Sequence, residues 1–216
     1  MGGFDIGRAL VQFLVFMFAI TVHESSHAAT ANYFGDPTAK RLGRISLNPI
    51  RHIDLFGTVI FPVMLALFGW PVFGWAKPVP VNVHNLRSPK AHSMLVSAAG
   101  PASNLALALA AAIAFQGVMA VGASIPGPLY QPILYLIVMG ALVNVYLALF
   151  NMIPIHPLDG SGVLAGLLPD HLAAKYMQLQ TYGFLILFVI VYTGLIDRIM
   201  SPVALAILSL MGFTFR

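Results

Sequence analysis

Two histidines and a glutamate near the N-terminus have the spacing of a metal-dependent hydrolytic site. Positions 23–27 read His-Glu-Ser-Ser-His, inside an apolar stretch that we predict as one helix from Arg8 to Tyr33. Residues four apart lie one turn apart on the same helical face, so His23 and His27 can bind one metal ion. Glu24 then projects sideways, toward a water molecule on that metal. Because Glu24 is the only glutamate in 216 residues, it does not belong to a general acidic background.

A third metal ligand must come from elsewhere in the chain. A hydrolytic zinc site takes three protein ligands and leaves a fourth position for water. The chain has no cysteine, so the third ligand must be histidine or a carboxylate. Asp54 begins a short apolar stretch, and the remaining aspartates other than Asp159 fall in predicted tails or loops: Asp5, Asp36, Asp170 and Asp197. Asp159 lies at a broken helix end, where it could equally cap the next helix, and both roles remain open.

The composition is that of an integral membrane protein. The chain is 59% hydrophobic and 8% charged, with a mean hydropathy of +0.87, which excludes an ordinary soluble domain. The net charge of +4 and the pI near 9.6 indicate basic cytoplasmic loops that meet acidic lipid headgroups. We expect no nucleic-acid partner, because no basic patch is interleaved with aromatic residues. The N-terminus shows no cleavable signal pattern.

We predict one domain over 1–216, an all-α polytopic membrane protein with a helical bundle of about four to six spans. Its core covers about residues 8–165, and its C-terminal helices cover about 179–213. After the first span, apolar runs at 91–121, 131–150 and 179–196 predict further spans. A polar loop is expected from 151 to about 175. Asp197 and Arg198 should break the last span from a short final helix at 199–213.

The apolar stretch 53–69 is too short for a regular span. It has only 17 residues, whereas a helical span needs about 20. Both flanks are basic, with Arg51 before it and Lys77 after it. We therefore expect a re-entrant or interfacial hairpin that enters and leaves by the same face. An ordinary short span is the alternative, and short extended pieces are expected around 44–47.

The distribution of basic residues predicts the orientation in the membrane. If the first span runs from outside to inside, eight of the eleven basic residues share one side: Lys40, Arg41, Arg44, Arg51, Lys77, Arg87, Lys90 and Lys175. That side should be cytoplasmic in a multi-pass protein of the cell's inner or plasma membrane. His23, Glu24, His27 and Asp159 then fall toward the same side, which supports joining them into one site.

Several other polar residues admit two interpretations. Asn104 and Asn144 lie within spans, as interhelical hydrogen-bonding residues or as lining of a substrate groove. His156 is a loop histidine or an additional metal ligand. His52 is a solvated loop end or part of a cavity rim.

Two separated motifs give the chain a resemblance to a known family. The pentad at 23–27 in a first span and the later run Asn151-x-x-Pro154-x-x-Pro157-Leu158-Asp159-Gly160 resemble the site-2 protease family of intramembrane zinc metalloproteases. Three other stretches resemble its compact bacterial branch, which lacks PDZ and CBS domains: Gly43-Arg44-Ile45-Ser46-Leu47-Asn48-Pro49, Gly74-Trp75-Ala76-Lys77-Pro78-Val79-Pro80 and Ala99-Gly100-Pro101-Ala102-Ser103-Asn104. The resemblance covers about residues 15–165.

The resemblance implies a site and an activity. His23, His27 and Asp159 would bind one zinc ion, Glu24 would be the general base, and Asn151 would position substrate or stabilise the oxyanion. The implied activity is hydrolysis of peptide bonds within or near transmembrane segments of single-span membrane proteins, in regulated intramembrane proteolysis. The alternatives are a metal or proton transporter that uses histidine and aspartate ligands, and a catalytically inactive scaffold relative. The sequence does not indicate an oligomeric state.

Overall fold

The computed structural model describes residues 6–68 and 74–213, and the described part of the chain is helical with no strand. Three helices are long and apolar enough to cross a membrane, namely α1 (Ile6–Tyr33), α4 (Pro89–Val121) and α5 (Gly127–Asn151). α7 (Asp170–Gln178) and α8 (Gln180–Tyr192) meet at 62° and could form one broken span. The prediction of an all-α polytopic membrane protein is confirmed, with three candidate spans, or four if the bent pair is one span, against the four to six expected.

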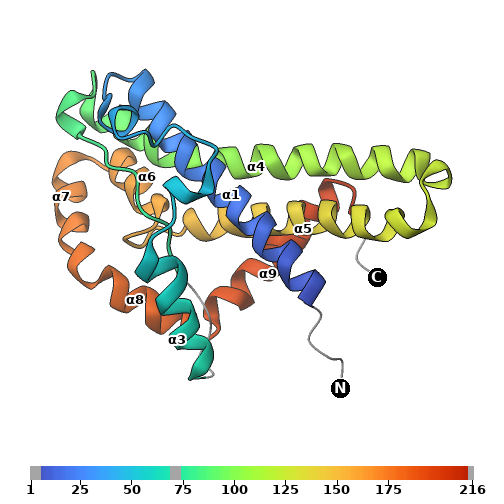
Figure 1. The fold of residues 1–216 in the computed structure, drawn as a ribbon. Coiled ribbons are helices and arrows are strands. Elements are labelled where there is room, and N and C mark those ends of the chain that lie inside the picture. Colours follow the sequence, from blue (N-terminus) through green and yellow to red (C-terminus); the bar gives the residue numbers. More distant parts are fainter. Residues whose placement is uncertain (1–5, 69–73, 214–216) are drawn as a thin grey trace.

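α4 is the central helix of the bundle. It packs against α1, α5 and the short α6 (Asp159–Leu167), and Figure 1 shows α4 and α5 running side by side. The two are joined by a turn that includes η4 (Gly122–Ser124). Where α4, α5 and α9 (Leu195–Leu210) meet, the buried core consists largely of small residues, including Ala108, Ala112, Ala141 and Ala204. Small residues allow close helix approach in lipid, where van der Waals packing holds helices together.

The outer surface of the long helices is apolar. Leu10, Phe13 and Leu14 of α1 are each more than half exposed, as are Leu109 and Ile113 of α4. Soluble proteins rarely expose a continuous apolar surface of this kind. The helix surfaces therefore fit a hydrocarbon environment.

The segment 53–69 forms a short helical arm. A π-helical turn, η2 (Leu55–Ile60), continues into α3 (Phe61–Leu67), and 13 helical residues extend only about 20 Å. Beyond residues 69–73, which lie outside the described part, the chain returns to the base of the arm. There Trp75 N–H donates to Gly57 O (3.1 Å) and Lys77 N–H donates to His52 O (2.9 Å). The arm thus leaves and rejoins the protein at the same level, as a re-entrant hairpin does.

The polar segment between α1 and the arm differs from the sequence prediction. It contains α2 (Thr38–Arg41) and the 3-10 turn η1 (Pro49–Arg51), and the extended pieces expected around 44–47 do not form a strand. Side chains bind the local carbonyl groups instead of a neighbouring strand. The Arg44 guanidinium donates to Arg51 O, and His52 Nε2–H donates to Ser46 O (2.9 Å).

The C-terminal part also corrects two expectations. The predicted loop 151–175 contains α6 and most of α7, two helices of nine residues each. The glycines of α6 and the polar composition of α7 hid their helical pattern. The expected break at Asp197 and Arg198 is wrong. The chain turns at Gly194, whose φ of 69° favours glycine. Asp197 lies in the first turn of α9, where carboxylates are favoured.

A buried carboxylate fixes the end of α1 to the segment that precedes α4. Asp36 is fully buried and accepts hydrogen bonds from Thr38 N–H (3.1 Å), from Asn82 N–H (2.7 Å) and from Asn85 Nδ2 (2.9 Å), in and beside η3 (Val83–Asn85). Burial alone would raise the pKa of Asp36, but these donors outweigh it and hold the pKa below its ordinary value. The clamp fixes α1 and α4 relative to each other.

Candidate metal centre

Helix α1 presents His23 and His27 together on one buried face. The two residues are 4% and 7% exposed, and their rings meet edge to face with centroids 4.7 Å apart. The spacing of four residues produces this arrangement directly, since it corresponds to one helical turn. The pair of imidazoles that the sequence predicts is therefore preformed.

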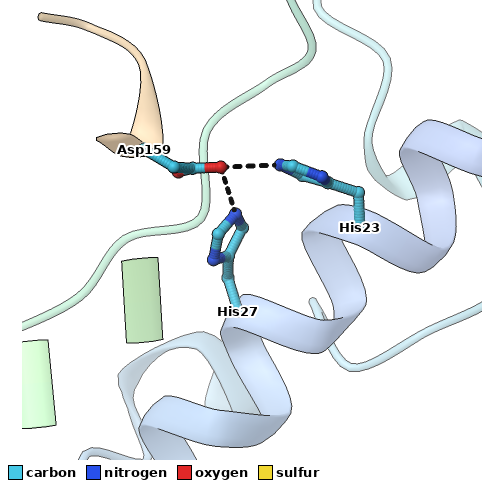
Figure 2. Close-up of side chains that lie close together, drawn as sticks. All are labelled: His23, His27 and Asp159. Carbon is cyan, nitrogen blue, oxygen red and sulfur yellow. Dashed lines mark ion pairs between the residues drawn. The ribbon is translucent and has the colours of Figure 1, made fainter. Parts of the chain in front are cut away.

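Asp159 completes the group from the start of α6. Its Oδ2 atom lies 3.0 Å from His23 Nε2 and 3.3 Å from His27 Nε2, and Figure 2 shows all three side chains converging. The N-cap position of α6 belongs to Leu158, so Asp159 is not the helix cap that the sequence allowed. The next residue must be glycine, because a Cβ at Gly160 would overlap the carbonyl group of Met152.

The hydrogen bonds on the far sides of the two rings fix their tautomers. Nδ1 of His27 lies 2.7 Å from the carbonyl oxygen of Val96, and Nδ1 of His23 lies 2.6 Å from Oδ1 of Asn104. Both partners can only accept, so each Nδ1 carries the proton and donates. Each neutral ring then directs the lone pair of Nε2 at Asp159, which is the usual state of metal-binding histidines.

Three electron-pair donors with no proton between them require a cation. The Nε2 atoms and the carboxylate oxygen all lie within 4.8 Å of one another, and Asp159 Oδ2 is buried without a hydrogen-bond donor. Leaving a buried acceptor unsatisfied costs about 1–3 kcal/mol. Ligands held at about 2.0–2.1 Å in a zinc tetrahedron lie about 3.3 Å apart, close to the two observed separations. The residues present fit a zinc ion.

Glu24 lies in the same helical turn as the two histidines. It is half-buried, and its charge is near enough to interact with His23, His27 and Asp159, and also with His52. A carboxylate beside the metal ligands, but not part of the ligand group, is the arrangement that a general base requires.

Gly100 of α4 lies directly against the ligands. A Cβ at this position would overlap Nε2 of both His23 and His27. Only glycine lets the α4 backbone approach the imidazoles so closely. The motif around Gly100 does not indicate this role by itself, because the role depends on a contact between segments more than 70 residues apart.

A chain of buried amides supports His23. Asn104 is fully buried, and its Nδ2 donates to Asn144 Oδ1 (2.8 Å) and to Ala19 O (3.3 Å). Asn144 in turn donates to Gly140 O (2.8 Å). Asn104 and Asn144 do form the interhelical hydrogen bond expected as one of two interpretations. The structure adds that Asn104 also contacts His23, one of the two imidazoles of the candidate metal centre.

Two further candidates lie outside the ligand group. Asn151 ends α5, and its Nδ2 donates to Leu147 O (3.0 Å) in its own helix, so its role toward substrate stays a prediction. His156 lies beside Gln180 (3.1 Å between Nε2 atoms) and lines a pocket with Tyr176. Burial lowers the pKa of His156. It is not a member of the metal-binding group among the described residues.

His52 is more deeply buried than a solvated loop end. Only 1% of its surface is exposed, and its ring is tied to the polar segment through Ser46. The sequence interpretation of an exposed loop histidine is therefore wrong.

Three similar proteins from other organisms all carry names of zinc metalloproteases. "Putative zinc metalloprotease YwhC" of Bacillus subtilis (strain 168) is 36% identical over 196 residues, which cover 90% of this chain and 86% of the relative. "Putative zinc metalloprotease Rip2" of Mycolicibacterium smegmatis is 25% identical over 89% of this chain and 71% of its own. The Rip2 of Mycobacterium tuberculosis is 32% identical over 68% of this chain and 52% of its own.

No protein-family model and no solved structure matches the chain. The match to YwhC nevertheless extends over 90% of this chain, so it spans the positions of both motifs. The chain also has a group of two histidines and an aspartate that could hold a metal ion in an apolar helical protein. It belongs to the site-2 protease family of zinc metalloproteases.

Proposed function

We propose that this protein is an intramembrane zinc metalloendopeptidase that cuts single-span membrane proteins within or near their transmembrane segments, in regulated intramembrane proteolysis. The convergence of His23, His27 and Asp159 on one point carries the proposal. Both histidines lie on α1, which is long and apolar enough to cross a bilayer, and Asp159 begins the short α6. The three residues are the proposed zinc ligands.

The chain's own residues would perform the proton transfers. Zinc held by the three ligands supplies Lewis acidity, which activates water and polarises a peptide carbonyl group. Glu24 accepts the proton of the attacking water and returns it to the leaving amine as the C–N bond breaks. Asn104 and the Val96 carbonyl group hold the two imidazoles in the tautomer that binds metal.

A substrate helix must open before it can be cut. Its carbonyl groups are engaged in i to i−4 hydrogen bonds and are unavailable to a nucleophile. The polar segment at 34–52 and the re-entrant arm would provide a hydrated approach to the site from the cytoplasmic side. Asn151, at the end of α5 near the broken segment, is proposed to position the substrate or its oxyanion.

A transporter is less well supported. A translocation path needs ionisable residues at successive depths, and the described residues contain one group of three potential metal ligands, at one level. The intact Glu24 argues against an inactive scaffold.

Cleavage by the purified protein tests the proposal. Protein in liposomes is incubated with a tagged single-span substrate, and the cut site is mapped by mass spectrometry. Glu24→Gln should retain zinc and lose about 10²–10⁴-fold in rate, while Asp170→Asn, an exposed acid outside the site, should match the wild type. Cleavage that survives Glu24→Gln would overturn the proposal, as would cuts confined to soluble segments.

Cysteine labelling tests the orientation of the protein in the membrane. Because the chain has no cysteine, one cysteine introduced at Lys40 or at His84 can be labelled selectively. A membrane-impermeant maleimide should reach these positions in inverted vesicles and not in intact cells. The opposite pattern would contradict a cytoplasmic site.

A further inference from the structure

The loop that precedes the third candidate ligand depends on other segments for its position. It covers residues 152–158, between the end of α5 and the start of α6, and forms no regular helix. Pro154 and Pro157 lack a backbone N–H, so the loop cannot satisfy its carbonyl groups in a helical pattern. One bond of its own, from Leu158 N–H to Ile155 O (2.9 Å), turns the chain toward α6. Other loop carbonyl groups need donors from elsewhere.

The junction of α7 and α8 contacts this loop at three places. The Tyr176 hydroxyl group donates to Pro154 O (2.8 Å), and the Nε2 atom of Gln180 lies 3.1 Å from Nε2 of His156. A Cβ at Gly183 would overlap the carbonyl group of His156. Glycine therefore lets the backbone of α8 lie directly against the loop.

The three contacting residues share one face across the bend between the two helices. Positions 176, 180 and 183 are four and three apart, which is the spacing of one helical face, although α7 and α8 meet at 62°. α7 also packs against α6, and Figure 1 shows these two helices side by side. A cavity of about 80 Å³ lies between the junction, the loop and Ser161 of α6. The loop is thus held by discrete contacts and has room to move when one is lost.

The position of the loop determines the position of Asp159. The later part of α6 is fixed to α4, because Cβ atoms at Gly162 and Gly166 would overlap side chains of α4. The first turn of α6 is bonded to the loop instead, since both the N–H and the hydroxyl group of Ser161 donate to Leu158 O (3.0 and 2.7 Å). A metal site accepts ligand distances within about 0.2 Å of the ideal value. A small shift of the loop would therefore be felt at the metal.

We propose that the α7–α8 junction positions the third metal ligand. Tyr176, Gln180 and Gly183 hold the loop so that the carboxylate of Asp159 meets the two imidazoles of α1 at metal-binding distance. None of the three residues binds the ion, so they are positioning residues. The inference rests on the proposed function for its zinc site, but metal affinity tests it without any cleavage assay.

Removal of one hydroxyl group tests the contact with the loop. Tyr176→Phe keeps the ring and loses the hydrogen bond to Pro154 O. Its zinc affinity, measured by competition with a chelator in detergent, should fall about 10-fold or more. Tyr182→Phe is the matched control, because the side chain of Tyr182 is 59% exposed, and it should bind zinc as wild type does. Equal affinity in Tyr176→Phe and wild type would overturn the inference.

A second substitution displaces the loop without removing a hydrogen bond. Gly183→Ala places a methyl group against the carbonyl group of His156, and its zinc affinity should also fall about 10-fold or more. Gly117→Ala is the control, because a Cβ at Gly117 meets nothing within 4 Å. A Gly183→Ala protein with the affinity of wild type would show that the loop does not need this contact.

A double substitution separates positioning of the ligand from a general loss of stability. In an Asp159→Ala background only His23 and His27 remain to hold zinc. Tyr176→Phe should then leave the residual affinity unchanged, because no carboxylate is left to be placed. If Tyr176→Phe lowers the affinity by the same factor with and without Asp159, its effect does not pass through that ligand, and the inference is wrong.

These measurements also keep the two proposals apart. Wild-type protein that binds zinc but does not cleave membrane substrates defeats the proposed function and leaves the inference standing. Cleavage by wild type, with a zinc affinity that ignores Tyr176 and Gly183, defeats only the inference. Wild-type protein without zinc affinity defeats both.

Discussion

Two neighbouring parts of the interface between α4 and α5 lie one helical turn apart and have opposite character. We call them its polar end and its alanine end. At one end Asn104 and Asn144 are buried and bonded to each other and to His23. At the other end Ala108 and Ala141 are completely buried in an apolar contact. The same two helices thus change from hydrogen bonding to close packing within four residues.

The free energies expected for the contacts at each end indicate the role of that end. A hydrogen bond between membrane helices contributes only about 0.6 kcal/mol on average, so the asparagine pair adds little to stability. Its effect lies in fixing one imidazole tautomer, and loss of such a partner costs about 10–100-fold in metal affinity or activity. The alanine end has the reverse role, because close packing stabilises helix association and carries no chemistry. Function and stability are therefore separable along one interface.

The largest expected loss of zinc and of cleavage comes from filling the space between α4 and the imidazoles of His23 and His27. Gly100→Ala introduces a methyl group that overlaps both imidazoles, and a displacement of about 1 Å at a catalytic group can cost about 10²-fold. We expect zinc content and cleavage both to fall by about 100-fold or more, measured by metal analysis and by the liposome assay.

A second glycine of the same helix provides the control. A Cβ at Gly117 meets nothing within 4 Å, so Gly117→Ala should leave zinc and cleavage unchanged. If Gly100→Ala also keeps its zinc, the close approach of α4 to the two imidazoles is not needed for the metal site.

Local spacing was sufficient to predict the pair on α1. His23, Glu24 and His27 follow from one helical repeat, and the re-entrant arm follows from its length and its basic flanks. The long apolar helices follow from hydropathy alone. Their ends shift by a few residues, as with α5, which begins at Gly127 and not near Gln131. These features depend only on neighbours in sequence.

The rest depends on contacts between distant segments. Gly100 and Asn104 take their roles from α1, which lies about 70–80 residues earlier, and no local pattern encodes that contact. His52 has polar neighbours in the sequence, which leave a solvated loop end and a cavity rim both open, whereas packing of η1 against α1 buries it. Asp159 could not be told from a helix cap until its distance to both histidines was known.

An intermediate loss of zinc affinity is expected when an apolar residue replaces Asn104 at the polar end, and a loss of stability is expected when Ala108 at the alanine end is enlarged. Asn104→Leu removes the acceptor of His23 Nδ1–H, and we expect zinc affinity to fall about 10–100-fold with a small change in unfolding temperature. Ala108→Leu overfills the alanine end and should lower the free energy of unfolding by about 1–3 kcal/mol with zinc affinity unchanged. Competition with a chelator and thermal unfolding in detergent measure the two quantities. Equal loss of zinc in both variants would show that the ends are not separable.

Asp36→Asn should have the smallest effect on the metal centre, because the hydrogen bonds of Asp36 stabilise the fold and do not contact the candidate metal ligands. Its folded pKa lies below the ordinary value of 3.8, so the ionised carboxylate stabilises the folded state fully above about that pH. This contribution disappears as pH falls through the lower folded pKa. Asp36→Asn cannot ionise, and should be less stable than wild type by about 1–3 kcal/mol near pH 6.

The pH dependence of that difference distinguishes charge from shape. The gap in unfolding temperature between wild type and Asp36→Asn should be constant from pH 6 to 5 and should shrink only in more acidic solution, with zinc content at pH 6 equal in both proteins. Other titrating groups are common to the two proteins and cancel in the difference. A gap that stays constant on acidification would mean that the clamp holds α1 and α4 through the fit of its side chain and that its charge contributes nothing. A gap that widens would mean that the charge destabilises the folded state.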